Sequence, residues 1–248
     1  MSLFTRTIVE TINQIVNNQA IIANNIANIS TPGFKSELES KIILFNKTKD
    51  NILQEKYILK NYKNNLHSSL KYTNNPLDYA IKNKNGWFTV KIDPKTVAYT
   101  KNGHFKINSQ RQLTIQNYPV LGTQGKIIVP INSNITITPF GIIKTANNGI
   151  KSYPNQQLKF KNIDINHLIH KKNGFYLLDK NATFISDNND DVSKIKLLPR
   201  TLEDSNVNLE ENMIKLISDA RKFDIQMKIL SMYNENAQTA NKLLNLNY

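Results

Sequence analysis

The sequence predicts an α+β protein in which a mainly antiparallel β domain is flanked by a long helix at each end. Two observations predict this fold class. Near both termini, apolar residues recur at alternating spacings of three and four, the a/d pattern of helices that pack on other helices. Between the termini the hydrophobic period changes to two, which is typical of strands. We expect the helices to pack as a coiled-coil-like layer in an assembly.

The first helix is expected from about Leu3 to Ile29. Pro32 disfavours helix at the preceding residue, and Gly33 can adopt a positive φ. We therefore expect a turn that redirects the chain and lies outside the β core. The apolar stripe of this helix is formed by Phe4, Ile8, Ile12, Ile15, Gln19, Ile22 and Ile26, and the turn motif by Thr31, Pro32, Gly33 and Phe34.

The last helix is expected to begin after Asn206 to Asn208, with Glu210 and Glu211 in its first turn, where the helix dipole favours negative charge. Polar residues inside a seam cost stability and specify register. Because both seams are apolar, we expect their partners on other chains and loose helices in the monomer. The seam contains Leu209, Met213, Leu216, Ala220, Phe223, Met227, Leu230, Asn234, Ala237, Asn241 and Leu244.

Three amides, Asn24, Asn25 and Asn28, lie near the end of the first helix, and two of them share a face through their spacing of four. An ordinary solvated face would explain them. Amides beside alanines also suit close helix packing and hydrogen bonds to a neighbouring chain. The candidate assembly interface is therefore Ile8, Ile12, Ile15, Ile22, Asn24, Asn25, Ile26, Asn28, Met213, Leu216, Phe223, Met227, Leu230, Asn234 and Asn241.

The middle of the chain divides into a lysine-rich connector and a β domain. The connector, residues 35–75, could be extended or partly helical. The β domain, residues 76–200, is expected to be a small sandwich or open barrel, and residues 186–206 a linker. Residues 1–34 then form the N-terminal helix and turn, and residues 201–248 the C-terminal helix. Strands are expected at Phe88–Ile92, Val97–Thr100, Phe105–Ile107, Leu113–Ile115, Asn134–Thr138, Ile142–Lys144, Leu158–Phe160 and Phe175–Leu178.

The net charge of +13 raises the possibility of a nucleic-acid-binding protein. Residues 203–248 contain five basic and seven acidic side chains, a net charge of minus two, so the excess does not lie in the last helix. The middle is rich in Asn, Ile and Lys throughout, which a codon bias toward A and T explains without selection for a polyanion. We therefore expect no specific nucleic-acid site.

Other classes of protein find little support. No apolar run approaches the length of a membrane span, and the N-terminus does not resemble a cleaved signal peptide. Because the chain has no Cys, disulfides and thiolate metal sites are excluded. His167 and His170 share spacing suited to a metal, but Lys171 and Lys172 would repel a cation. Phosphate-loop, dinucleotide, hydrolase and zinc-protease motifs are absent, so we expect no enzyme, metal or cofactor.

Several motifs together resemble the bacterial flagellar rod and hook protein family. Ala23–Asn28 followed by Ser30–Lys35 is similar to the N-terminal signature of that family, and Ser205–Asn208 to its C-terminal helix entry. The resemblance covers essentially the full length, in the family's order. The segments similar to its central β domain are Leu77–Ile81, Asn85–Phe88, Ala98–Gly103 and Tyr118–Gly122.

The proximal rod branch of the family is the closer resemblance, because of Trp87 in the glycine-aromatic motif, Gln112–Gln116 and Ala220–Lys228. The resemblance implies a non-enzymatic subunit that assembles with other proximal and distal rod subunits into a helical drive shaft. It also implies export by the flagellar type III export apparatus without a cleaved signal, a place in the periplasmic rod of the basal body, and no membrane insertion. The alternatives are a distal rod protein, a basic nucleic-acid-binding scaffold, or an export-associated enzyme.

Overall fold

The computed structural model describes residues 3–47, 53–63, 68–94, 96–130, 133–146, 156–171, 174–179 and 195–245. The chain forms two compact units, each built from segments that are distant in sequence. The helical unit contains Met1–Ala27, Glu37–Asn61 and Asn208–Tyr248, and the β unit contains residues 28–36 and Tyr62–Val207. Long helices and antiparallel sheets coexist in the chain, which confirms the α+β class.

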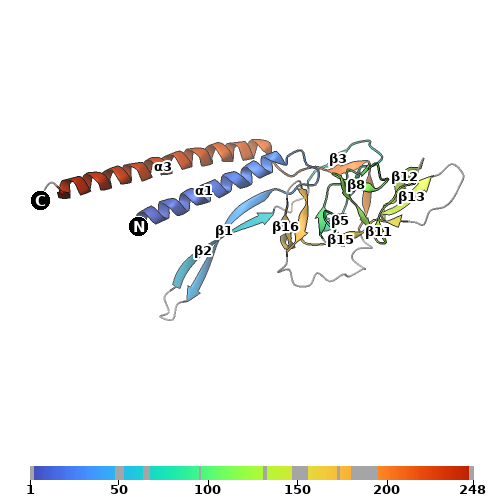
Figure 1. Ribbon diagram of the computed structural model, residues 1–248, viewed down its shortest axis with the longest axis horizontal. Coiled ribbons are helices and arrows are strands. Elements are labelled where there is room, and N and C mark those ends of the chain that lie inside the picture. The colour runs from blue at the N-terminus through green and yellow to red at the C-terminus, as the bar shows by residue number, and fades with distance from the viewer. Residues whose placement is uncertain are drawn as a thin grey trace. The chain divides into compact units, whose positions relative to one another are not determined.

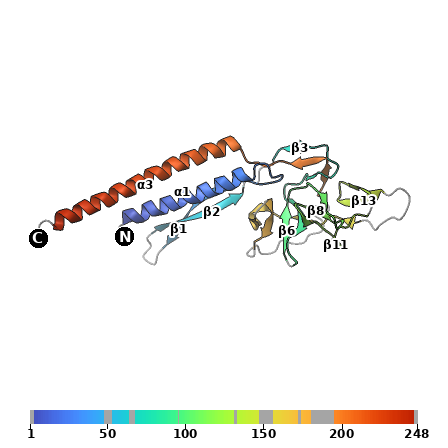
Figure 2. The ribbon, with the colours of Figure 1, turned by 45° about the horizontal axis from the view of Figure 1, so that its top comes forward.

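The helical unit is built on two helices that run antiparallel. Helix α1 (Leu3–Ala27) and helix α3 (Leu209–Asn245) lie side by side (Figures 1 and 2). The side chain of Asn208 caps α3 by accepting a hydrogen bond from the backbone N–H of Glu211 at 3.1 Å. Strands β1 (Glu37–Lys47) and β2 (Leu53–Lys63) form a two-stranded sheet beside α1. Most of the connector is thus extended, one of the two conformations that the sequence left open.

The helices of this unit fill part of their seams with each other. Ile8, Ile15 and Ile22 on α1 are buried, and the ring of Phe4 lies 5.1 Å from that of Tyr233 on α3. The expectation that all seam partners lie on other chains is therefore wrong for these isoleucines. They recur every seven residues along one face of α1, and α3 covers that face.

The β unit is antiparallel in every strand pairing of the described residues. Its largest sheet has five strands in the order β15-β5-β6-β17-β16. A 3₁₀ turn, η1 (Ile165–His167), directly precedes β16 in the chain. The strands are β3 (Leu70–Tyr72), β4 (Tyr79–Ile81), β5 (Gly86–Lys91), β6 (Val97–Thr100), β7 (Lys106–Ile107), β8 (Leu113–Ile115), β9 (Tyr118–Pro119), β10 (Leu121–Gly122), β11 (Gly125–Lys126), β12 (Asn134–Ile137), β13 (Ile142–Ala146), β14 (Gln156–Gln157), β15 (Phe160–Asn162), β16 (Leu168–His170), β17 (Tyr176–Leu178), β18 (Leu197–Pro199) and β19 (Thr201–Glu203).

Two adjacent residues of β5 divide the core into two clusters. Phe88 packs in the larger cluster with Phe105 and Leu113, whereas Trp87 packs in a smaller one with Tyr176. Successive side chains of a strand point to opposite faces of the sheet, which explains the division. The indole N–H of Trp87 donates to the carbonyl of Ile163 at 2.8 Å, so its one polar group is satisfied. The interpretation of Trp87 as a core residue is confirmed.

The expected linker over residues 186–206 is partly wrong. Residues 186–194 lie outside the described residues, but β18 and β19 follow, and they pair with β4 and β3. Each of these strands has only three residues, which is too short for a period of two to be recognised. The β unit therefore extends to the residues directly before α3.

Candidate assembly surface

The turn motif is a part of the β unit, which corrects the expectation that it lies outside the β core. Phe34 is completely buried. Gly33 has a φ of 71°, and a Cβ atom at this position would lie 2.6 Å from the Cβ of Lys101. Both the backbone conformation and the close approach require glycine. Thr31 starts the turn, since its carbonyl accepts a hydrogen bond from the backbone N–H of Phe34 at 3.2 Å.

The turn motif is bonded to the segment that leads into α3. The N–H of Gly33 donates to the carbonyl of Glu203 at 2.7 Å, and the N–H of Asn206 donates to the carbonyl of Phe34 at 3.3 Å. The side-chain oxygen of Asn206 accepts a third bond from the N–H of Ser36 at 2.7 Å. The segment that follows α1 and the segment that precedes α3 are thus held together inside the β unit.

Three buried charged side chains lie at the same place. The ammonium of Lys35 is 2.5 Å from Oε1 of Glu203, and that of Lys101 is 3.5 Å from Oε2. The side chains are at most 4% exposed. Burial lowers the pKa of Lys101 to about 8, although the charge of Glu203 opposes the shift. This cluster, Lys35, Lys101 and Glu203, is called the clamp below.

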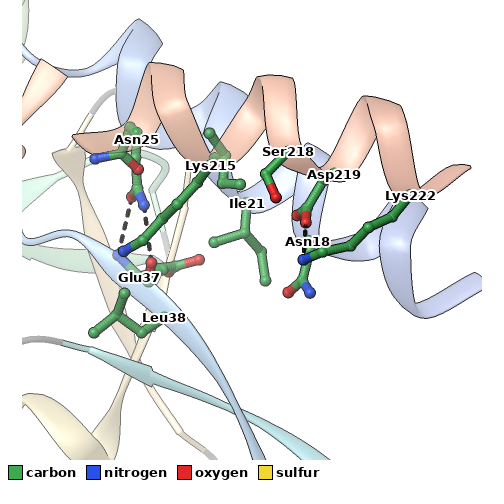
Figure 3. A pocket seen from close by; sticks show the side chains of 11 residues that line it. Asn18, Ile21, Asn25, Glu37, Leu38, Lys215, Ser218, Asp219 and Lys222 are labelled. Atoms are coloured by element: carbon green, nitrogen blue, oxygen red, sulfur yellow. Dashed lines mark hydrogen bonds and ion pairs between the residues drawn. The ribbon is translucent and has the colours of Figure 1, made fainter. Parts of the chain in front are cut away.

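Asn25 joins α1 to the start of β1 within the helical unit. Its side-chain oxygen accepts from the N–H of Glu37 at 2.9 Å, and its amide donates to the carbonyl of Glu37 at 2.8 Å (Figure 3). Asn25 is 1% exposed, so this amide is used inside its own chain. Asn24 and Asn28 are half-buried, and Asn28 accepts a hydrogen bond from the hydroxyl of Thr31 at 3.3 Å.

A groove lies between α1, β1 and α3, and its charged residues pair within the chain. Lys222 is 2.9 Å from Asp219 (Figure 3), and Lys215 is 2.5 Å from Glu211. These pairs and the amide of Asn25 give the groove polar as well as apolar walls. It is lined by Asn18, Ile21, Ile22, Asn25, Glu37, Leu38, Asn212, Lys215, Ser218, Asp219 and Lys222.

A different face of the helix pair is apolar and exposed. On α1, Val9 and Val16 directly follow the buried Ile8 and Ile15, and they are 39% and 46% exposed. On α3, Met213 and Met227 are 50% and 44% exposed, and Met213 directly follows the buried Asn212. One residue corresponds to about 100° of rotation around a helix.

The two exposed stripes lie on the same side of the helix pair. Helices α1 and α3 run in opposite directions (Figure 1). On each helix the exposed residues follow the packed residues by one position, so in an antiparallel pair both stripes face the same side. This surface is called the open face. It contains Val9, Ile12, Val16, Ala23, Leu209, Met213, Ala220 and Met227, of which Ile12 is half-buried and the others are exposed.

Helix α3 exposes further apolar residues away from α1. Ile214, Ile217, Ile225 and Met232 are each more than half exposed. They lie about half a turn from the packed residues Asn212 and Asp219. Exposed apolar residues of α3 therefore occur on more than one of its sides, interspersed with charged residues.

The predicted α3 seam mixes two kinds of position. Leu216, Phe223 and Leu230 are half-buried, as expected of packed positions, whereas Met213, Met227, Asn234 and Asn241 are exposed. The contact with α1 also uses Asn212 and Asp219, which are 8% and 7% exposed. Apolar periodicity does not indicate polar contact residues, and the sequence therefore predicted the exposed methionines as seam positions. On α1, Ile26 is half-buried.

Within the described ranges, no three His, Cys, Asp or Glu side chains gather as a metal site would require. The ring of His170 instead packs edge-on against Phe34 at 5.2 Å and contacts Tyr176 at the same distance. None of the described helices combines the length and the apolar character that crossing a bilayer demands.

Three family models match the chain in order. Residues 6–35 match the flagella basal body rod protein model, residues 80–145 the flagellar hook protein FlgE/F/G D1 domain, and residues 199–243 the flagellar basal body rod FlgEFG protein C-terminal model. These matches coincide with the motifs that suggested the family: the turn motif, the central β segments and the entry into α3.

Full-length relatives agree with these matches. The flagellar basal-body rod protein FlgF of Buchnera aphidicola subsp. Baizongia pistaciae is 56% identical over 100% of both chains. FlgF of Salmonella typhimurium is 32% identical over 94% of each. FlgG of Borreliella burgdorferi is 27% identical over 91% of this chain and 92% of its own. The chain therefore belongs to the FlgF family of flagellar basal-body rod proteins.

Proposed function

We propose that this chain joins the flagellar rod through the open face of its helix pair, which packs against helices of neighbouring rod subunits. As a member of the FlgF family it is a structural, non-enzymatic subunit of the basal-body rod. The observation that carries the proposal is the set of exposed apolar side chains that α1 and α3 present on one side.

The energetics favour burial of this surface. Each large apolar side chain that leaves water contributes about 1.5–3 kcal/mol. Val9, Val16, Met213 and Met227 are already about half covered in the monomer, so each would contribute about half of this amount on complete burial. A contiguous apolar surface of this kind marks an interaction site in soluble proteins.

The candidate interface residues divide into two roles under this proposal. Ile8, Ile15, Ile22, Phe223 and Leu230 hold the helix pair together, so they present the open face rather than contact a neighbour. Met213 and Met227 contact a neighbouring helix, together with Ile12. Asn234 and Asn241, on the exposed part of α3, set the register of that contact, since a polar residue in an apolar seam favours one alignment.

We further propose a place in the proximal rod, next to other proximal and distal rod subunits. Support comes from identity, which is 32–56% with three FlgF relatives and FlgF of Escherichia coli, and 25–27% with FlgG relatives. Export through the flagellar type III apparatus without a cleaved signal, followed by assembly in the periplasm, belongs to the same proposal. The distal rod is the alternative position, and labelling this subunit in purified basal bodies distinguishes the two.

The test places a charge on the open face. Met213→Asp and Met227→Asp should abolish incorporation into the rod, because a carboxylate in a packed apolar contact is costly to desolvate. Asn236→Asp is the matched control, since Asn236 is an exposed residue of α3 that lies away from the open face. Normal rods that contain either methionine variant would overturn the proposal.

A further inference from the structure

We propose that Glu203 closes the β unit: its carboxylate bridges two buried lysines, and the unit becomes stable only when the segments next to both helices are in place. The clamp brings together residues from three distant parts of the chain. Lys35 follows α1, Lys101 follows β6, and Glu203 ends β19, a few residues before α3. Lys35 and Glu203 are 168 residues apart in sequence.

Glu203 contacts the two lysines with different oxygens. Oε1 lies 2.5 Å from the ammonium of Lys35, and Oε2 lies 3.5 Å from that of Lys101. A single carboxylate therefore bridges both cations. Lys35 also donates to the hydroxyl of Ser68 at 2.9 Å, and Lys101 donates to the carbonyl of Asn83 at 3.4 Å.

The surroundings of the clamp offer Lys101 little further compensation. Its ammonium lies 5.4 Å from the centre of the Trp87 ring, a weak attraction compared with that of a carboxylate. Lys35 and Lys84 act on Lys101 as like charges, and Glu203 is the acid that opposes them. Two ammonium groups and one carboxylate leave one excess positive charge in a buried site.

The loss of Glu203 would therefore affect much more than one ion pair. Two buried ammonium groups would lose the carboxylate that bridges them, which is strongly unfavourable in a site of low polarity.

Closure has a consequence for assembly, and this consequence rests on the proposed function. The chain leaves the β unit for α1 and α3 through the two segments that the clamp and the neighbouring backbone bonds hold together. A β unit that has closed thus holds the residues after α1 and the residues before α3 next to each other. The clamp itself is a property of the monomer and can be tested without a rod.

The test is urea unfolding of the full-length monomer at pH 7, with the β unit followed by the fluorescence of Trp87, the chain's one tryptophan. Glu203→Gln should reduce the folding equilibrium constant of the β unit at least 100-fold. Glu210→Gln is the matched control, because Glu210 is an exposed acid at the start of α3, and it should stay within 3-fold of the parent.

A charge-free variant separates charge from packing. The triple variant Lys35→Met, Lys101→Met, Glu203→Met keeps long side chains and removes all three charges, so it should recover most of the stability that Glu203→Gln loses. A Glu203→Gln chain within 3-fold of the parent would overturn the proposal. So would a triple variant as unstable as Glu203→Gln, since side-chain shape rather than charge compensation would then hold the site. Neither result depends on rod assembly, which the methionine variants test separately.

Discussion

The two units of the chain use apolar residues in opposite ways. In the β unit, Trp87, Phe88 and Tyr176 are fully buried, and even lysines are enclosed with a counter-charge. In the helical unit, the buried positions among the described side chains of α3 are the polar Asn212 and Asp219, while its methionines and most of its isoleucines are exposed. The β unit buries its large aromatic side chains within the chain, whereas the helical unit leaves many apolar side chains of α3 exposed.

The comparison between the units predicts the largest difference in stability for substitutions of two phenylalanines, one in each unit. Phe34→Ala should destabilise the β unit by about 3–5 kcal/mol, because it removes a fully buried ring. Phe4→Ala is the matched change in the helical unit. Phe4 is 48% exposed and contacts Tyr233, so its loss should cost under about 1 kcal/mol. Chemical denaturation of both variants measures the difference, and equal costs would remove the distinction between the units.

The pH dependence of stability reports on the buried lysine of the β unit. The pKa of Lys101 is about 8 in the folded chain and 10.5 in the unfolded chain, so the unfolded chain binds more protons between these values. Stability should therefore rise with pH between about 8 and 10.5, by on the order of 3 kcal/mol from this residue. Lys101→Met should remove the rise and be more stable than the parent at pH 7. Denaturation midpoints measured between pH 8 and 10.5 test this prediction. The same rise of stability with pH in the Lys101→Met variant would contradict the lowered pKa of Lys101.

Alanine substitutions at two glycines distinguish the cost of a steric clash from the cost of a positive φ. Gly33→Ala should cost more than about 1–3 kcal/mol, because it combines a positive φ with a clash against Lys101. Gly125→Ala has a positive φ of 116° but no atom within 4 Å of the added methyl group, so it should cost only the backbone strain. Thermal unfolding of both proteins gives the comparison. If Gly33→Ala is no worse than Gly125→Ala, the turn motif is not packed as described.

Adjacent residues on α1 provide the smallest monomer effects and the sharpest contrast. Ile15→Ala should loosen the helix pair by about 2 kcal/mol and leave the β unit unaffected, because Ile15 is buried within the helical unit. Val16→Ala should hardly change the monomer, since Val16 lies on the open face, but it should weaken rod assembly. Helical circular dichroism and assembly assays distinguish the two, and a similar loss of monomer helix stability for both would show that the open face is misplaced.

The sequence predicted the elements whose signals are local. The long a/d patterns located both helices, and alternation over several residues located β5, β6, β12 and β13. The family resemblance then identified the rod proteins, because its motifs recur in order along the whole chain.

Features that depend on distant partners were not predicted. The burial of Lys35 depends on Glu203, and no local pattern indicates that a lysine after a turn is enclosed. Strands β18 and β19 exist because β4 and β3 pair with them. Similarly, Asn212 and Asp219 pack as polar contact residues, so the true face of α3 against α1 differs from its most apolar seam.

Hydrogen exchange on the monomer tests the central claim that the two units differ in completeness and that the turn motif belongs to the β unit. We predict protection of the amides of Gly33 and Phe34 comparable to that of β5 and β6, with much weaker protection in α3 beyond residue 233. Incorporation into rods should raise the protection of α3 and leave the β unit unchanged. Rapid exchange at Gly33 and Phe34 in a folded monomer, or strong protection of the end of α3 before assembly, would contradict this account.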